Sequence, residues 1–297
     1  MKILVSGSSG LIGSALVALL IENRHEVVRL ARKKGVAGAA FWDPATGFID
    51  AASLEGMDAV VHLAGENIAA RRWTRAQKAR ILESRTAGTT LLAGALAKLA
   101  RKPQVMVTAS AIGYYGDRRD EILREHSPPG DGFLPEVCSQ WEASADAAAR
   151  SGIRVVHPRL GIVLARQGGA LPKMVLPFRL GVGGKIGDGR QFMSWIALDD
   201  VARVFLYCME NSAMRGPVNA VAPVPVRNEE FTGIVGRVLH RPTLFRLPAF
   251  AARIVLGEMA DELLLASARV EPAKLLTAGF RFRRENLEET LRQILLH

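Results

Sequence analysis

The chain has 297 residues, long enough for one large domain or a domain with a smaller partner, and its 49% hydrophobic and 23% charged residues exclude a disordered protein. The net charge of +10 raises the question of a nucleic-acid partner, yet the Lys and Arg residues are spread along the chain and aromatic residues make up only 6%. A groove that binds single-stranded nucleic acid needs basic residues interleaved with aromatic residues on which the bases stack, so we expect no nucleic-acid partner.

The two cysteines, Cys138 and Cys208, are too few for a disulfide framework or a cysteine metal site. We therefore expect no metal and a reducing, cytoplasmic location. The longest apolar run, residues 11–21, is too short to cross a bilayer and is explained as a helix. Because a buried strand begins at the N-terminus, we expect no signal peptide and no membrane partner.

The first residues predict a strand, a tight turn and a helix. Residues 2–6 (KILVS) are a short apolar run typical of a strand, and residues 11–21 are typical of an apolar helix. The turn between them has the pattern G-x-x-G-x-x-G. A phosphate-binding turn of this kind is expected to use Gly7, Ser9, Gly10, Leu11, Ile12 and Gly13.

Each glycine of the turn has a separate expected role. Gly7 lets the chain turn sharply off the strand, Gly10 lets backbone approach a pyrophosphate, and Gly13 lets the helix pack against the sheet. The anion would then be held by free N–H groups and the positive dipole end of the helix. A glycine turn without a ligand is the alternative, and the strand–turn–helix context favours the binding site.

A second strand, residues 25–30, is followed by Arg32 and Lys33. About twenty residues past the glycines, such folds recognise the adenosine ribose, with an acid for a free 2′-hydroxyl and a basic residue for a 2′-phosphate. Arg32 lies nineteen residues past Gly13, and no Asp or Glu competes for this place. We therefore predict NADP(H) in preference to NAD(H).

Strands and helices alternate over the next hundred residues. Residues 58–63 (DAVVHL) predict a buried parallel strand that ends at Ala64 and Gly65, and its His62 is expected to be a core residue. The other expected elements are a strand at 39–42, a long helix at 74–100, a strand at 104–108, a polar loop at 113–135, a helix at 135–150 and a strand at 153–164.

This alternation predicts a Rossmann-type α/β fold, a doubly wound parallel sheet with helices on both faces. We expect an NADP(H)-binding domain over residues 1–168, with residues 190–222 partly returning to it. A smaller, mostly helical substrate domain is expected over residues 169–297. Its expected parts include a glycine-rich loop at 181–189, a helix at 198–211 and a closing helix at 284–296.

Several motifs together resemble a known family. GSSGLIG, VVHLAGENI, TASAIGYYG and HPRLGIVL are similar to the extended and atypical branch of the short-chain dehydrogenase/reductase superfamily. GGALPKM, GDGRQFMSWI and the tail GEMADELLLASARVEPAKLLTAGF resemble the NAD(P)-dependent epimerase/dehydratase-like subfamily called "epimerase family protein", which has a C-terminal domain of unknown function. The resemblance covers essentially the whole chain.

The resemblance implies further cofactor contacts. Leu63, Ala64 and Gly65 would lie beneath the adenosine and ribose, and Arg159 near the nicotinamide half. Arg85 stands where many relatives carry an active-site Asn. A guanidinium at this position is better suited to binding a phosphate or ribose oxygen than to transferring a proton. The alternative is that Arg85 is an exposed helix arginine without a function.

The chain departs from the superfamily at its usual catalytic pair. The superfamily pattern needs a Tyr and a Lys four residues apart, and no Tyr-x-x-x-Lys occurs in this sequence. On the corresponding helix Cys138 and Glu142 are four apart and share one face. The negative charge of Glu142 would oppose ionisation of the Cys138 thiol. Cys138 and Glu142 therefore cannot simply replace the Tyr and Lys of the superfamily. A buried cysteine and a helix-stabilising glutamate are the alternative reading.

Two other side chains are candidates for the chemistry. Ser110 follows the strand at 104–108 and could hold a substrate oxygen, although strand-end serines also cap turns. Tyr114 is the remaining candidate acid.

These residues support two hypotheses. The first is an NADP(H)-dependent oxidoreductase or epimerase-like enzyme acting on an unidentified small molecule; a nucleotide-sugar epimerase proper is disfavoured because it needs an intact base. The second is a non-catalytic NADP(H)-binding protein that senses redox state or binds a partner. A homodimer is suggested only by analogy with the fold.

Overall fold

A computed structural model of the chain describes residues 1–296. The contacts divide it into two compact units. Unit 1 comprises Met1–Ser110, Val137–Pro158 and Ala202–Val218, and unit 2 comprises Ala111–Glu136, Arg159–Val201 and Asn219–His297. The segment Ala111–Glu136 thus groups with unit 2, whereas the sequence pattern predicts it within the first domain; the boundary at residue 168 stays a prediction.

Unit 1 is built on a mostly parallel sheet with the strand order β14-β9-β6-β5-β1-β2-β3-β4. The pairs β1–β2, β1–β5, β5–β6 and β6–β9 are parallel, and the short β4 pairs antiparallel with β3. The strands are β1 (Lys2–Ser6), β2 (Glu26–Ala31), β3 (Ala39–Asp43), β4 (Phe48–Ile49), β5 (Ala59–His62), β6 (Val105–Thr108), β7 (Ser110–Ala111), β9 (Arg154–Leu160) and β14 (Gly216–Ala220).

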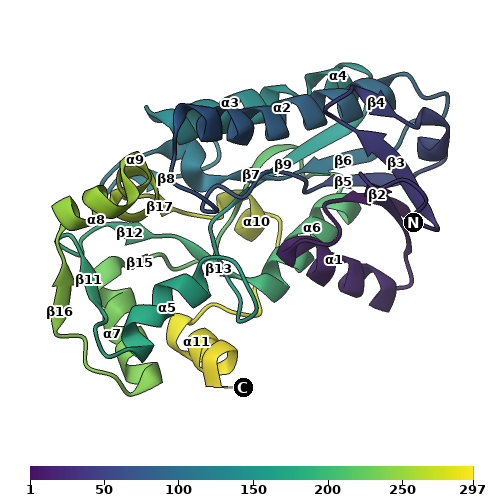
Figure 1. Cartoon of the computed structure of the whole chain (residues 1–297). Helices are drawn as coiled ribbons and strands as arrows, with labels where there is room; N and C mark the ends of the chain where they lie inside the picture. The colour runs from purple at the N-terminus through teal and green to yellow at the C-terminus, as the bar shows by residue number, and fades with distance from the viewer. Residues whose placement is uncertain (297) are drawn as a thin grey trace. The chain divides into compact units, whose positions relative to one another are not determined.

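Helices cover both faces of this sheet. α1 (Leu11–Glu22) lies on one face and α2 (Arg75–Ala97) on the other (Figure 1). The remaining helices are η1 (Ala51–Leu54), α3 (Phe133–Ala143), α4 (Asp146–Arg150) and α6 (Leu198–Glu210). The predicted doubly wound Rossmann-type fold is therefore confirmed.

The central strands are apolar because both of their faces are covered. Ile3, Leu4 and Val5 of β1 are fully buried, and all four residues of β5 and of β6 are buried. Leu92 and Leu96 of α2 pack into the same core. α2 begins where the Thr74 hydroxyl accepts a hydrogen bond from the backbone N–H of Gln77 at 3.2 Å, an N-cap that the sequence pattern did not specify.

Unit 2 combines short helices with two-stranded sheets. Its helices are η2 (Ile112–Tyr115), α5 (Leu171–Arg179), α7 (Asn228–Leu239), α8 (Ala249–Leu256), α9 (Glu258–Ala260), the π-helical turn η3 (Asp261–Leu265), α10 (Ala273–Thr277) and α11 (Leu287–Leu296). Its strands are β8 (Ile122–Leu123), β10 (Ile162–Leu164), β11 (Gly184–Ile186), β12 (Phe192–Met193), β13 (Trp195–Ala197), β15 (Val226–Arg227), β16 (Phe245–Leu247) and β17 (Arg269–Val270). A separate core packs Phe231, Val235 and Leu291 around Trp195.

Two predicted elements are each broken in two. The helix predicted at 135–150 is divided between α3 and α4, because the Ser144 hydroxyl donates to the Gln140 carbonyl at 2.7 Å and the Ala145 N–H bonds to Glu142, three residues back. The strand predicted at 153–164 is interrupted at Gly161. A side chain there would place Cβ 2.6 Å from the Ser194 carbonyl oxygen, and β10 then pairs with β13.

Two other predictions differ in detail. The loop at 113–135 contains β8, which pairs with β17. The closing helix begins at Leu287 instead of residue 284, because the Asn286 side-chain oxygen accepts the backbone N–H of Glu289 at 3.1 Å and so caps the helix there. Within residues 1–296, no helix is both long enough and apolar enough to span a membrane.

Candidate functional site

The glycine turn between β1 and α1 has the geometry of a phosphate-binding loop. Gly7 has φ of +65°, and a Cβ there would lie 2.8 Å from the carbonyl carbon of Leu63. A Cβ at Gly13 would lie 2.1 Å from the Gly7 carbonyl oxygen. Gly13 is therefore required for packing within the turn itself, whereas the motif predicts a role in packing the helix on the sheet.

Gly10 differs from both. A Cβ there would meet only the Gly7 carbonyl oxygen, at 3.3 Å, so the protein itself leaves this side of the turn open. Gly10 is also the residue before α1, and no side chain caps the helix. The first N–H groups of α1, which include those of Leu11 and Ile12, have no acceptor within the helix. The exposed backbone at Ser9 and Gly10 thus fits a pyrophosphate.

Two cations follow the neighbouring strand. Leu30 of β2 lies beside Ser6 of β1, so the chain that follows Leu30 emerges at the same edge of the sheet as the glycine turn. Arg32 and Lys33 directly follow β2, and both are exposed. Their charges at this edge fit the additional phosphate of NADP(H).

A buried hydrogen-bond chain holds the segment after β5. The Ser6 hydroxyl accepts the backbone N–H of Leu63 at 3.1 Å and lies 2.6 Å from Nδ1 of His62. Burial lowers the pKa of His62 to about 4. His62 is thus a neutral core residue, as predicted, that fixes the backbone leading to Ala64 and Gly65.

Arg85 of α2 lies against this segment. Its guanidinium is 5.0 Å from the Trp141 ring and donates to the Ile81 carbonyl at 3.0 Å, and a Cβ at Gly65 would lie 3.6 Å from its side chain. Burial lowers the pKa of Arg85, while the nearby Cys138 and Glu66 raise it. The alternative of an exposed helix arginine is wrong, since Arg85 is largely covered.

Three of the four candidate catalytic residues belong to unit 1. The Ser110 hydroxyl donates to Oε1 of Glu142 at 2.6 Å, and Ser110 is only 1% exposed. Cys138 lies one turn before Glu142 on α3 and is also buried. The sequence predicts Ser110 and the Cys138–Glu142 pair as candidates but does not predict the contact between Ser110 and Glu142, because 32 residues separate them.

The fourth candidate, Tyr114, lies in unit 2 together with Arg159. The Arg159 guanidinium is 3.4 Å from the centre of the Tyr114 ring and donates to the Tyr115 hydroxyl at 2.9 Å. Burial raises the pKa of Tyr115 to about 12, although Arg159 opposes the shift. Tyr115 is therefore a poor proton donor, and Tyr114 stays the candidate. Arg159 is 2% exposed, and its expected place near the nicotinamide stays a prediction.

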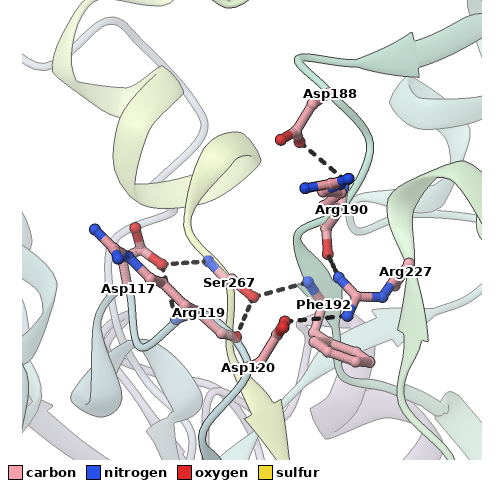
Figure 2. A network of polar contacts seen from close by, with 8 residues as sticks. All are labelled: Asp117, Arg119, Asp120, Asp188, Arg190, Phe192, Arg227 and Ser267. Carbon is pink, nitrogen blue, oxygen red and sulfur yellow. Dashed lines mark hydrogen bonds and ion pairs between the residues drawn. The ribbon is translucent and has the colours of Figure 1, made fainter.

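A polar network in unit 2 joins the loop at 117–120, the segment 188–192, Arg227 of β15 and Ser267 (Figure 2). The buried Ser267 donates to the carbonyl of Arg119 and accepts the N–H of Phe192 at 3.0 Å. Arg227 donates to Asp120 at 3.1 Å and to the carbonyl of Arg190, and its guanidinium is 4.4 Å from the Phe192 ring. The network holds β12 in place against the loop around Arg119.

Comparison with known proteins gives the family. The model of the NAD dependent epimerase/dehydratase family matches residues 3–220. The chain belongs to this epimerase/dehydratase family. A second model, a domain of unknown function named DUF1731, matches residues 247–294. The resemblance inferred from the motifs is thereby confirmed.

Its relatives match almost the whole length of this epimerase/dehydratase chain. It is 42% identical to an epimerase family protein of Mycobacterium leprae over 288 residues, which are 97% of this chain and 93% of the relative. The crystal structure of human epimerase family protein SDR39U1 with NADPH matches with a TM-score of 0.90 and 36% identity, covering 100% of both chains. A nucleoside-diphosphate sugar epimerase from Corynebacterium glutamicum matches with a TM-score of 0.83 and 38% identity, covering 99% of this chain and 58% of that one.

Proposed function

We propose that this protein binds NADP(H) and acts as an oxidoreductase or epimerase-like enzyme on an unidentified small molecule. The observation that carries the proposal is the glycine turn, whose Gly10 side is open while Arg32 and Lys33 follow the adjacent strand end. The NADPH in the human relative, which is 36% identical, supports the same cofactor.

The residues that would hold the cofactor follow from this arrangement. The turn residues Gly7, Ser9, Gly10, Leu11, Ile12 and Gly13 would bind the pyrophosphate, and Arg32 and Lys33 the 2′-phosphate. Leu63, Ala64 and Gly65 would lie beneath the adenosine ribose, and Arg85 would donate to a ribose or phosphate oxygen. Arg159 would lie near the nicotinamide half of the cofactor.

NADP(H), when bound, supplies or takes up a hydride, and the protein has to move a proton and orient the substrate. Glu142 is the group that we propose for the proton: its carboxylate would accept the proton of a substrate hydroxyl when NADP⁺ takes up the hydride, and its carboxylic acid would return that proton to a carbonyl oxygen when NADPH supplies the hydride. Ser110 already donates to Glu142, so its remaining role is to orient that carboxylate and to accept a hydrogen bond from substrate through its oxygen. Cys138 would line the same site, and Tyr114 is the alternative acid.

One observation favours the second hypothesis, a non-catalytic NADP(H)-binding protein. The Ser110 proton points to Glu142, and no Tyr-x-x-x-Lys pair supplies another donor. Such a protein would respond to the NADP(H) redox state by binding a partner. We also propose a cytoplasmic location, because neither Cys138 nor Cys208 forms a disulfide.

Calorimetry with NADPH and NADH tests the cofactor assignment. The wild-type protein is expected to bind NADPH at least about tenfold more tightly than NADH, since one charged contact to the 2′-phosphate contributes on the order of 1.5–3 kcal/mol. Arg32→Asp should abolish that preference. Arg24→Asp, an exposed change at the opposite end of β2, should leave it intact. Equal binding of both dinucleotides by the wild-type protein would contradict the assignment.

Turnover separates the two functional hypotheses. The purified protein is mixed with NADPH and a panel of carbonyl compounds and nucleotide sugars, and NADPH absorbance is followed. An enzyme should oxidise NADPH with one member of the panel, and Glu142→Gln should lose this activity while NADPH affinity is unchanged. Tight NADPH binding without turnover of any panel member would favour the non-catalytic protein.

A further inference from the structure

The residue before α3 cannot cap the helix with a side chain. Gly132 is in the N-cap position, since its carbonyl accepts the backbone N–H of Glu136 at 3.3 Å, and glycine lacks the side-chain oxygen that usually caps a helix there. Of the first three helical residues, Pro135 has no N–H, so the N–H groups of Phe133 and Leu134 are the ones that need an acceptor from outside the helix.

Glu262 of η3 supplies this acceptor. One oxygen of its carboxylate accepts the N–H of Phe133 at 2.8 Å, and the other accepts the N–H of Leu134 at 2.7 Å. Gly132 leaves room for the carboxylate, because its φ is +118° and a Cβ there would lie 3.0 Å from Oε1 of Glu262. All four residues belong to unit 2. The first turn of α3 is therefore completed by a residue 128 positions farther along the chain than Leu134.

The DUF1731 match contains Glu262 and also contacts the loop before α3. β17, which lies in the same match, pairs with β8 of that loop. The carbonyl of Ser267 accepts the N–H of Arg118 at 2.9 Å, and the Glu125 carboxylate accepts the N–H of Lys274 at 3.0 Å. The loop that leads into α3 is therefore held by the same segment that caps the helix.

α3 carries two side chains of the proposed active site. Cys138 lies on its second turn and is 3% exposed, and Glu142, near its end, accepts the Ser110 hydroxyl at 2.6 Å. A helix of 11 residues is too short to be stable by itself in water, so its position depends on contacts with the rest of the fold. The contacts of Glu262 anchor the start of the helix that carries Glu142.

We propose that Glu262 is a positioning residue through which the DUF1731 segment fixes α3 and with it Cys138 and Glu142. The consequence for chemistry rests on the proposed function of Glu142, whereas the link between Glu262 and α3 does not. Without the Glu262 carboxylate the first turn of α3 opens, and Glu142 is held less accurately against Ser110. The DUF1731 segment thus contributes to the active site through this helix.

Labelling of the full-length protein with N-ethylmaleimide tests the link to α3, because Cys138 is buried and reacts only after the helix opens. Mass spectrometry identifies the labelled peptide. Glu262→Ala should label Cys138 at least about fivefold faster than wild type, the factor by which loss of a helix cap shifts an opening equilibrium. Glu262→Gln keeps one side-chain oxygen as an acceptor and should restore most of the protection. Ile234→Val, a core change of similar cost in unit 2, is the matched control and should leave Cys138 as protected as in wild type.

Turnover tests the consequence for Glu142. With a panel compound that the wild-type protein converts, Glu262→Ala should lower kcat at least about tenfold, since misplacing a catalytic group by about 1 Å can cost on the order of a hundredfold. NADPH affinity in calorimetry should stay unchanged, because the glycine turn takes no part in the contact. Glu262→Gln should recover most of the kcat, and Glu285→Ala, an exposed change in unit 2, should match wild type.

The outcomes separate this proposal from the proposed function. Equal labelling of Cys138 in Glu262→Ala and Ile234→Val overturns it. Faster labelling with an unchanged kcat also overturns it, since Glu142 would then not depend on the capped turn. Failure of the proposed function looks different: the wild-type protein converts no panel compound, and the labelling of Cys138 alone then decides whether Glu262 positions α3.

Discussion

The three glycines of the first turn illustrate how one residue type serves different physical needs. Gly7 has a positive φ and lies against the backbone of Leu63. Gly13 lies against the carbonyl of Gly7, and only Gly10 has an open side with an ordinary φ of −74°. Gly7 and Gly13 are therefore needed for folding, whereas a Cβ at Gly10 needs only a small shift of the Gly7 carbonyl, so that the main demand for glycine there comes from a ligand that approaches the turn.

Alanine substitutions separate these roles. Gly13→Ala places Cβ 2.1 Å from the Gly7 oxygen and should cost on the order of 1–3 kcal/mol of stability. Gly10→Ala should unfold at nearly the wild-type denaturant concentration but lose NADPH affinity in calorimetry. As a control, Gly94→Ala on α2, where a Cβ meets nothing within 4 Å, should slightly raise stability without changing affinity. Unchanged NADPH affinity in Gly10→Ala would argue against pyrophosphate at this turn.

His62 should make the stability depend on pH. Its pKa is lowered from 6.5 to about 4 in the folded protein, so between these pH values the unfolded chain binds more protons. Stability is therefore complete above about pH 6.5 and falls as the pH drops toward 4, by about 3 kcal/mol in total. Urea unfolding of wild type and His62→Phe across this range should show a flatter profile for the variant. Replacing the exposed His126 with Gln should leave the profile unchanged, and a wild-type-like slope in His62→Phe would rule out this origin.

At the scale of elements, α3 shows how a distant segment determines where a helix begins. Glu262, in the π-helical turn η3, accepts the backbone N–H groups of Phe133 and Leu134 at 2.8 and 2.7 Å. These groups have no acceptor within the helix, and a carboxylate at a helix N-terminus also interacts favourably with the dipole. The same helix carries Cys138 and Glu142 farther along the chain.

Removing this cap should be measurable. Glu262→Ala leaves two N–H groups without their acceptor and should destabilise the protein by about 1–2 kcal/mol in chemical denaturation. Glu285→Ala, which removes an exposed carboxylate elsewhere in unit 2, is the matched control and should change stability by less than about 0.5 kcal/mol. If both variants unfold alike, the contacts of Glu262 contribute nothing to the helix start.

At the scale of the whole molecule, the chain passes between the two units several times, since each unit is assembled from three separate segments. Neither half of the sequence therefore corresponds to one unit. The central sheet of unit 1 gathers strands from the N-terminus to β14, and unit 2 begins in the middle of the epimerase/dehydratase match.

Cofactor binding should stabilise the folded protein as a whole. A ligand present at a hundred times its dissociation constant adds about 2.7 kcal/mol, so NADPH should raise the melting temperature by several degrees. NADH at the same concentration should raise it less, because it lacks the phosphate that Arg32 and Lys33 would bind. Differential scanning fluorimetry measures both shifts, and Arg24→Asp should keep the wild-type difference. Identical shifts with the two dinucleotides would contradict the preference for NADP(H).

The sequence by itself determined the local features of this protein. The apolar runs of β1 and β5, the glycine turn and the long helix α2 could be read from neighbouring residues, because backbone sterics and burial periodicity act over a few positions. The motifs were also sufficient to recognise the family, which the match over residues 3–220 confirmed.

Only the tertiary structure decided how distant residues meet. The contact of Ser110 with Glu142, the cap that Glu262 provides for α3, and the stacking of Arg159 on Tyr114 join residues 32, 129 and 45 positions apart. No local pattern specifies such contacts, since they form when the packing of whole elements brings two side chains together. The interruption of the strand at Gly161 has the same origin, because the neighbouring carbonyl belongs to Ser194.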